Sequence, residues 1–415
     1  MLVFLFSFYD GAAQTDTLTL RQCLRAAQQN AVISSNFSVL NDLTDLKRAN
    51  VKASNLPALS AYGKAWYQSD AISIPMQGGA LEVDRFQYNG GLELDQKLFD
   101  GGLAGKALKL ESFVLQAESG KIETDLYQLN NTVTDLFFQM ILLDRKSGIL
   151  KLQEEILVER SREMGSAVEN GIVKKNDLQK IEAELMIVQQ QIVDLDGTYQ
   201  QLLVTLKVLT GIPVTGEIQL TLGDDPESFS EKSRPELSYF DSETRRLESM
   251  AELQKARYLP KLYAYGQAGY SYPGLNFYEN QPDYYYVVGA RLSWTIFDWQ
   301  QNKREVEIIR KQKESIAVRQ SDFDQKKTIA REKERAVQEK LDHMIALDQE
   351  IINKREAVRR GSETALENGT ITATDYLEDL NAEIKARIDA ESHVLELRHS
   401  LILLRLIEGV DLAEL

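Results

Sequence analysis

Few side chains in this sequence could carry out catalysis or hold a metal. The chain of 415 residues contains three histidines and one cysteine. His393 and His399 stand six positions apart, so they do not share a helix face and form a poor pair of metal ligands. The single cysteine, Cys23, excludes a disulfide framework and a zinc site built on cysteines. No nucleophile–base pair stands out. The sequence therefore predicts a protein that is not an enzyme and needs no cofactor or metal.

One glycine-rich segment superficially resembles a phosphate-binding loop. Gly101, Gly102 and Gly105 precede Lys106, but their spacing differs from G-x-x-x-x-G-K-[ST], and Ala107 replaces the hydroxyl residue. A turn from a strand into a helix explains this segment better. Nucleic acid is also excluded as a partner. The net charge is −15, whereas phosphates need a cationic surface.

The first residues resemble the end of a secretory signal peptide. An apolar run, Leu2 to Phe8, is followed by the small residues Ala12 and Ala13. We therefore expect residues 1–14 to be a signal peptide remnant and the mature chain to cross the inner membrane. No run of 18 apolar residues predicts a transmembrane helix.

Long helices must provide the framework. None of the eight prolines lies between 76 and 212 or after 282, and proline disrupts helix interiors. Apolar residues also recur at coiled-coil spacing in the first of these stretches, at Ile122, Leu126, Leu129, Val133, Leu136, Met140 and Leu143.

The chain resembles itself when it is shifted by 198 residues. Leu98-Phe99-Asp100 aligns with Ile296-Phe297-Asp298, and Glu169-Asn170-Gly171 aligns with Glu367-Asn368-Gly369. Leu56-Pro57 and Leu259-Pro260 form a further pair at a shift of 203. These matches predict two structural repeats, which a segment rich in proline and glycine separates.

Each repeat also contains segments typical of strands. Apolar and polar positions alternate from Tyr286 to Ile296, as expected for a strand with one apolar face. All three tryptophans and 12 of the 17 tyrosines lie within 56–100 or 258–300. Tyr and Trp favour a membrane–water interface. We therefore interpret the strands as membrane strands, with strand and interface aromatics at Trp66, Tyr67, Tyr88, Tyr286 and Trp294.

The expected organisation follows from these patterns. The first repeat is 15–213, the linker or equatorial segment is 214–234, and the second repeat is 235–415. Each repeat begins with a helix. In the first repeat we then expect strands at 58–68 and 87–99, a long helix at 101–168 and a helix at 174–210. In the second repeat we expect strands at 261–271 and 285–297, a long helix at 299–366 and a helix at 372–408.

Four strands cannot close a barrel, and an open edge cannot lie in lipid with its backbone groups unpaired. Several chains must therefore share one barrel, with eight strands from two chains or twelve strands from three. The fold class that we predict is mainly α with a small β part.

In the order, spacing and duplication of these motifs, the sequence resembles the TolC-like outer membrane factor family of bacterial efflux channels. The resemblance rests on the Leu-Pro and Phe-Asp pairs above, on Arg234-Pro235-Glu236-Leu237, and on the two Glu-Asn-Gly turns. The resemblance implies a homotrimer with a barrel of long helices and a twelve-stranded β-barrel in the outer membrane of a Gram-negative bacterium. It also implies a passive exit duct that docks through a periplasmic adaptor to an inner-membrane transporter.

The resemblance also assigns roles to residues at the helical tips. Adaptor-contacting tips would be Asn170, Gly171, Ile172, Asn368, Gly369 and Thr370. Asp375 and Glu378, with Asp177 as the first-repeat counterpart of Asp375, would line the periplasmic entrance. An alternative reading of Asp375 and Glu378 is that these acids only stabilise the start of a helix. Leu366 and Ile371 stand where some members have gate residues, so that gate is not expected here, although Arg359, Arg360 and Tyr376 lie nearby. A rival function for the whole chain is a soluble periplasmic coiled-coil scaffold or adaptor.

Overall fold

The computed structural model describes residues 16–76, 79–213, 218–221, 234–276, 278–410 and 412. The predicted signal peptide remnant and most of the predicted linker lie outside these residues. The chain divides into two units, which are described separately. The first is Met1–Asn36, Lys121–Ser238 and Ser321–Leu415; the second is Phe37–Gly120 and Tyr239–Gln320.

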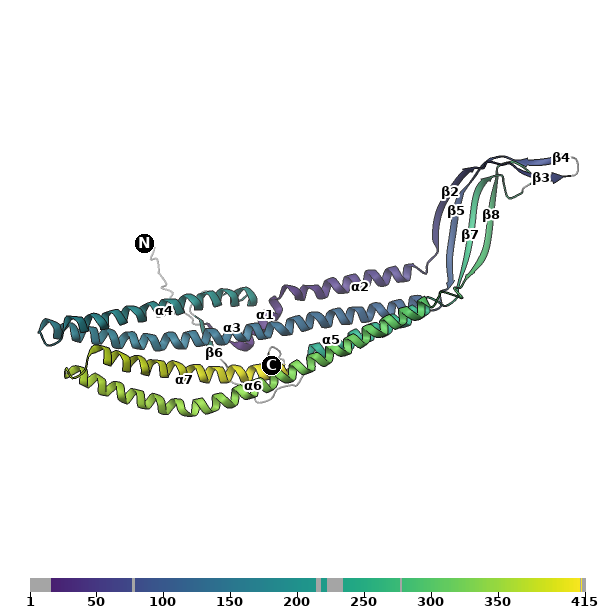
Figure 1. The fold of residues 1–415 in the computed structure, drawn as a ribbon. Coiled ribbons are helices and arrows are strands. Elements are labelled where there is room, and N and C mark those ends of the chain that lie inside the picture. The colour runs from purple at the N-terminus through teal and green to yellow at the C-terminus, as the bar shows by residue number, and fades with distance from the viewer. Residues whose placement is uncertain are drawn as a thin grey trace, which may run out of the picture. The chain divides into compact units, whose positions relative to one another are not determined.

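The first unit consists of helices and one short pair of strands (Figure 1). Its complete elements are β1 (Asp16–Thr19), α1 (Leu20–Asn30), a 3-10 helix (Val32–Ser35), α4 (Lys175–Thr210), β6 (Ile218–Thr221) and α7 (Ala373–Glu408). Two longer helices, α3 (Leu103–Glu169) and α6 (Gln301–Glu367), end in this unit. The strands β1 and β6 pair in parallel, and the sequence analysis predicted neither of them.

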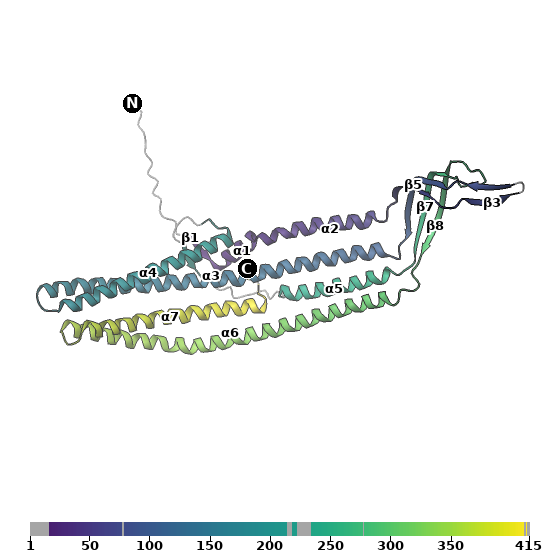
Figure 2. The same ribbon diagram turned by 45° about the horizontal axis from the view of Figure 1, so that its top comes forward.

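Antiparallel helical hairpins dominate this unit. Figure 2 shows α4 alongside α3 and α7 alongside α6. Both α4 and α7 end at a glycine with positive φ, Gly211 at 68° and Gly409 at 96°, which accepts the left-handed conformation without steric strain. The long helices contain 67 residues each and the shorter ones 36 each. The two repeats therefore have matching helix lengths.

Apolar side chains hold these helices together in two clusters. Val133, Phe137 and Met140 of α3 are fully buried in the first cluster. This cluster also contains residues of α1, α4 and α7: Cys23, Leu24, Leu203, Leu206 and Leu406. The second cluster lies nearer the tips and joins α3, α4 and α7 through Leu157, Ile181, Val188, Tyr376 and Leu380. Because Val133, Met140 and Leu157 occupy heptad positions, the core face of α3 follows the coiled-coil spacing.

The second unit contains the sheet and the helices next to it (Figure 1). Its complete elements are β2 (Ala58–Tyr67), β3 (Ile72–Met76), β4 (Gly79–Val83), β5 (Phe86–Phe99), β7 (Lys261–Tyr272) and β8 (Asp283–Ser293), together with most of α2 (Asn36–Ala53) and α5 (Pro235–Ala256). A small apolar cluster of Phe240, Leu247, Ile309 and Ile316 packs α5 against the start of α6.

Four antiparallel strands form the main sheet, in the order β2-β5-β7-β8. The hairpins of the two repeats therefore meet along β5 and β7. Within this sheet β2 and β8 are edge strands, each paired on one side. A short hairpin, β3–β4, extends the connection between β2 and β5, and the sequence did not predict it.

The strand expected at 285–297 ends earlier. In the structure β8 ends at Ser293, which pairs with Lys261, the first residue of β7. Pro260 precedes Lys261 and has no N–H to donate, so β7 offers no backbone partner for residues 294–297. Apolar and polar side chains alternate as far as Ile296 in the sequence. A β-strand, however, also needs a neighbouring strand for its backbone hydrogen bonds, and beyond Ser293 there is none in this sheet.

Candidate functional site

The sheet has one apolar face and one polar face, both defined here by the strand register. Residues directly opposite each other on paired strands share a face. Leu92 pairs with Ala61 and Ala268, and Ala268 pairs with Tyr286, so all four lie on the apolar face. The same reading places Leu59, Tyr67, Phe86, Tyr88, Leu94, Leu262, Tyr270, Tyr284, Val288 and Leu292 there.

The apolar face carries no charged side chain at any paired position. Gln96, which pairs with Ala264, brings an uncharged amide side chain to this face. Large apolar side chains nevertheless project from it into open space: Tyr284, Tyr286 and Val288 are each about 80% exposed. Such a contiguous exposed apolar surface marks a binding or membrane surface rather than a face that water covers.

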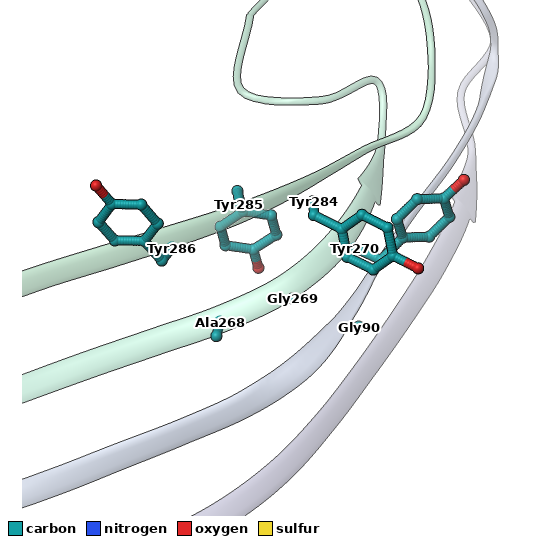
Figure 3. Close-up of a pocket in the computed structure, with 7 residues that line it drawn as sticks. All are labelled: Gly90, Ala268, Gly269, Tyr270, Tyr284, Tyr285 and Tyr286. Carbon is teal, nitrogen blue, oxygen red and sulfur yellow. The ribbon is translucent and has the colours of Figure 1, made fainter.

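The polar face has the opposite character. The register places Lys64, Glu93, Asp95, Lys97, Asp283 and Arg291 on it. Arg291 forms an ion pair of 3.1 Å with Asp95, and its guanidinium lies 5.4 Å from the ring centroid of Tyr263. Tyr285 donates a hydrogen bond of 2.7 Å to Asn89. Figure 3 shows Tyr285 and Tyr286 pointing to opposite sides of β8.

The register distinguishes Trp66 from the other strand aromatics. Trp66 lies in β2, as do the neighbouring aromatics in their strands, but it lies on the polar face, because it pairs with Gln87. The amine of Lys64 lies 5.1 Å from the centre of the Trp66 ring. The residue type does not show which face of the sheet Trp66 occupies. Its odd or even place along β2 does, because alternate residues of a strand point to opposite faces.

A hollow on the sheet shows how small residues shape its surface. It is lined by Gly90, Ala268, Gly269 and the rings of Tyr270, Tyr284, Tyr285 and Tyr286 (Figure 3). A Cβ at Gly269 would lie 2.6 Å from the carbonyl oxygen of Gly90. A glycine is therefore required where β5 and β7 approach each other this closely.

The two helical tips have the same construction. Asn170 and Asn368 each donate a side-chain hydrogen bond to the carbonyl four residues earlier, at 2.8 and 2.9 Å. Gly171 and Gly369 follow with φ of 71° and 68°. The N–H groups of Ile172 and Thr370 then bond to Ala167 and Ala365, which completes a Schellman-type stop at each tip.

All six predicted tip residues are exposed, and the tips enclose a shared pocket. Ile172 presents an apolar side chain there that is 75% exposed. The pocket has a volume of about 680 Å³. It is lined by residues of both tips, among them Met164, Ile172, Val173, Leu366, Gly369 and Ile371.

The predicted entrance acids occupy different environments. Asp375 belongs to a capping box: its carboxylate accepts hydrogen bonds from the backbone N–H and the hydroxyl of Thr372, at 2.9 and 2.7 Å. These bonds, first of all the backbone bond, lower the pKa of Asp375. Asp177 lies 3.6 Å from Lys180, and Lys180 donates to Thr374 at 2.8 Å. Glu378 is exposed. The sequence reasoning did not identify Lys180, which brings a positive charge close to both aspartates.

Removing the cap should loosen the start of α7. Thr372→Ala deletes the hydroxyl that accepts from the N–H of Asp375, and such changes cost about 1 kcal/mol. We expect amide exchange in the first turn of α7 to accelerate by about fivefold. The loss should shrink as the pH falls through the depressed pKa of Asp375, since a carboxylate whose pKa is lowered by folding stabilises only while it is ionised.

A matched control is available in the first repeat. Lys174, at the start of α4, makes no side-chain cap. Lys174→Ala should therefore leave exchange in the first turn of α4 unchanged. Equal acceleration in both variants would contradict the assignment of a specific cap to Thr372.

A charge network lies between the two tips, and the sequence did not predict it. The side chain of Arg160 is 8% exposed and pairs with Glu163 at 2.9 Å and with Glu367 at 3.2 Å. It also pairs with Glu363 and stacks 5.4 Å from the centre of the Tyr376 ring. Burial alone would lower the pKa of Arg160, but the bond to Glu367 and the surrounding carboxylates raise it overall.

The same network continues between α6 and α7. Arg359 bonds to Glu383 at 2.7 Å and to Glu363 at 2.9 Å. Glu383 is 6% exposed at its side chain and also accepts from Arg387. Buried charge is therefore paired on both sides, as burial in a low dielectric requires.

Two of the three histidines contact a carboxylate, and the cysteine is buried. His393 lies 2.8 Å from Asp348, and His399 lies 2.8 Å from Asp135. Burial raises the pKa of the Cys23 thiol to about 11, so it is a thiol at neutral pH. Among the residues that the structure describes, no cluster of three potential ligands could hold a metal ion.

The glycine-rich segment around Gly101 and Gly102 is the predicted turn from a strand into a helix and not a phosphate-binding loop. The carboxylate of Asp100 accepts from the N–H groups of Gly102 and Ala104, both at 2.8 Å. These bonds cap the start of α3, so the N–H groups that a phosphate would need are already occupied.

Comparison with solved structures identifies the fold. The channel "CmeC" of Campylobacter jejuni aligns with a TM-score of 0.69 at 15% identity, over 94% of this chain and 85% of that chain. CusC aligns with a TM-score of 0.70 at 13% identity, over 97% and 95%. The open state of the MtrE channel of Neisseria gonorrhoeae aligns with a TM-score of 0.65 at 15% identity, over 94% and 88%.

This is the fold of outer membrane channels. The TolC-like resemblance and the mainly helical fold class predicted from the sequence are thereby confirmed at the level of the fold. No family model and no curated protein matches the sequence. Within the described part of the chain, no helix is long and apolar enough to cross a membrane.

Proposed function

We propose that this chain is the outer membrane channel of an efflux or secretion system and serves as a passive exit duct. The observation that carries the proposal is the sheet, with its uncharged apolar face and its charged polar face. In a membrane barrel the lipid-facing side is apolar and the inner side is polar. The shared fold with solved outer membrane channels supports the same conclusion.

The proposed assembly is a homotrimer in the outer membrane of a Gram-negative bacterium. The sheet of one chain has edges at β2 and β8, and unpaired backbone groups at an edge are unfavourable in lipid. Edge-to-edge pairing of three chains would give twelve strands and a lumen. Pairing with a neighbour would also supply a partner to residues 294–297, which have none in the sheet of one chain.

The helical tips are the proposed contact with a periplasmic adaptor, which would connect the duct to an inner-membrane transporter. The support is the exposure of Ile172 and the pocket that the two tips share. Asp177, Asp375 and Glu378 are proposed to line the entrance, where carboxylates would favour cations. Because Asp375 also caps α7, its role at the entrance does not exclude its role in the helix.

The molar mass of the protein in mild detergent tests this proposal. Light scattering, with the detergent subtracted, should give a protein mass of about three chains. Conductance of the trimer in planar bilayers would then test the duct itself. A monodisperse monomer or dimer that stays soluble without detergent would contradict the channel and favour the periplasmic scaffold.

A further inference from the structure

The two repeats form the same turn with different residues. After Asp100, the backbone of Gly101 and Gly102 has φ of 71° and 79°. The equivalent residues after Asp298 are Trp299 and Gln300, with φ of 55° and 60°. Glycine adopts this left-handed conformation freely, whereas a bulky residue is strained there. The second repeat therefore keeps a tryptophan where the first repeat uses the residue best suited to the backbone.

Hydrogen bonds hold the strained turn in place. The carboxylate of Asp298 accepts from the N–H of Asn302 at 2.8 Å, and Arg304 donates to the carbonyl of Trp299 at 2.9 Å. The geometry is thus specified by the beginning of α6 and is the same turn that Asp100 builds in the first repeat. These bonds fix the backbone of the turn, so Trp299 has to adopt the left-handed conformation.

The Trp299 side chain packs little against the rest of the chain. It is 78% exposed, and its ring contact is with Phe297, at 4.9 Å between centroids. Phe297 is itself 69% exposed. Strain kept at an exposed position indicates that the side chain acts on something outside the chain.

The surroundings of Trp299 identify the partner by their chemistry. Along the chain, the apolar face of β8 is followed by exposed Trp294, Ile296, Phe297 and Trp299, and then by exposed Lys303 and Arg304. Acyl chains, the interfacial region and phosphate headgroups succeed one another in the same order in a bilayer leaflet. The cations complement phosphate, and the segment continues directly from the apolar face.

We propose that Trp299, together with Phe297, Lys303 and Arg304, anchors the channel to phospholipid at the helix-side boundary of the membrane. The proposal rests on the proposed function, because it needs the sheet to lie in a bilayer. It assigns the Trp299 indole to the headgroup–acyl boundary and the cations to the lipid phosphates. The rival occupant of this surface is a neighbouring copy of the chain.

Three single-tryptophan proteins can separate these possibilities. Each retains one of Trp66, Trp294 and Trp299 and replaces the other two by phenylalanine. They are reconstituted in vesicles whose phospholipids carry bromine either near the headgroup end or near the methyl end of the acyl chain. Bromine quenches tryptophan emission on contact, so the loss of emission reports proximity to lipid at each depth.

We expect the protein with Trp299 to lose more emission with bromine near the headgroup than near the methyl end. The protein with Trp66 should lose none, because Trp66 lies on the polar face. Quenching of Trp294 without quenching of Trp299 would overturn the anchor and leave the membrane channel intact. Absence of quenching in all three would overturn the channel as well.

A second variant tests whether Trp299 instead supports the fold. Trp299→Gly installs the residue that the first repeat uses at the equivalent turn. We expect the variant protein to keep its melting temperature in detergent and to retain less phospholipid on purification than the wild type. A marked fall in melting temperature, with unchanged phospholipid, would show that the indole packs within the protein assembly and would overturn the proposal.

Discussion

Val288→Arg is expected to prevent most of the protein from inserting in a membrane. Val288 lies on the apolar face of β8, opposite Gly266, and is 80% exposed. An arginine on the lipid side near the bilayer midplane costs about 2–4 kcal/mol, and a trimer would incur the cost three times. The yield of folded, membrane-inserted protein should fall severely. Vesicle flotation after refolding, followed by urea titration of the inserted fraction, measures the effect.

Val287→Arg provides the matched control. Val287 is the neighbouring residue of the same strand, has the same side chain, and lies on the polar face opposite Gln267, which in turn pairs with Glu93. An arginine there remains among polar groups, so insertion should stay near that of the wild type. Equal loss in both variants would show that β8 does not have a lipid side and a lumen side. A gain in solubility with Val288→Arg and no membrane-bound protein in the wild type would favour the soluble scaffold.

The fold was predictable because its strongest determinants are local in the sequence. Two long proline-free stretches, the first of them with heptad spacing, correspond to α3 with α4 and to α6 with α7. Alternating strands with small residues between them correspond to the two hairpins. The repetition at a shift of 198 residues placed each pair of elements in equivalent positions. Each of these signals is a direct effect of backbone geometry on residue choice.

The details that the sequence did not reveal depend on partners distant in the chain. Trp66 looks like the other strand aromatics until pairing with Gln87 fixes its face. The strand after Ser293 ends for want of a neighbour, although its side-chain alternation continues. Arg160 and Glu363 are 203 positions apart, and nothing in either local sequence indicates that they meet. Trp299 is different, since the shift of 198 residues aligns it with Gly101, although only the structure shows that both residues adopt a positive φ.

The two helical hairpins of the first unit differ in what holds them together. Buried apolar residues, among them Leu157 and Ile181, pack α3 against α4. Polar contacts are prominent between α6 and α7, where Arg359 and Arg387 bond to Glu383 and His393 lies against Asp348. Arg160 of α3 pairs with Glu363 and Glu367 of α6, so it adds a charged link between the two hairpins near the tips, beside the apolar cluster and the bond from Lys180 to Thr374.

Arg160→Met should therefore loosen the tips more than any other single substitution in this network. Methionine keeps the apolar stem but removes the cation, which leaves the Glu363 and Glu367 carboxylates without their shared partner from α3. Their side chains are 29% and 57% exposed, so water relieves part of the loss. The cost is then below that of a fully buried pair, at about 1–3 kcal/mol. Amide exchange in the last turns of α6 and the first turns of α7 should accelerate by about 5- to 150-fold.

Arg162→Met separates this effect from a general loss of positive charge. Arg162 lies two positions away on α3, has a side chain that is 77% exposed, and pairs with Glu159 of its own helix. Such exposed pairs contribute about 0.2–1 kcal/mol at most. Exchange at the tips should hence stay within a few-fold of the wild type. Similar acceleration in both variants would mean that net charge, and not the bridge from Arg160 to α6, holds the tips together. If neither variant changed exchange, the apolar cluster around Leu157 and Tyr376 would be sufficient to maintain this end of the helices, and the network would have no measurable share in its stability.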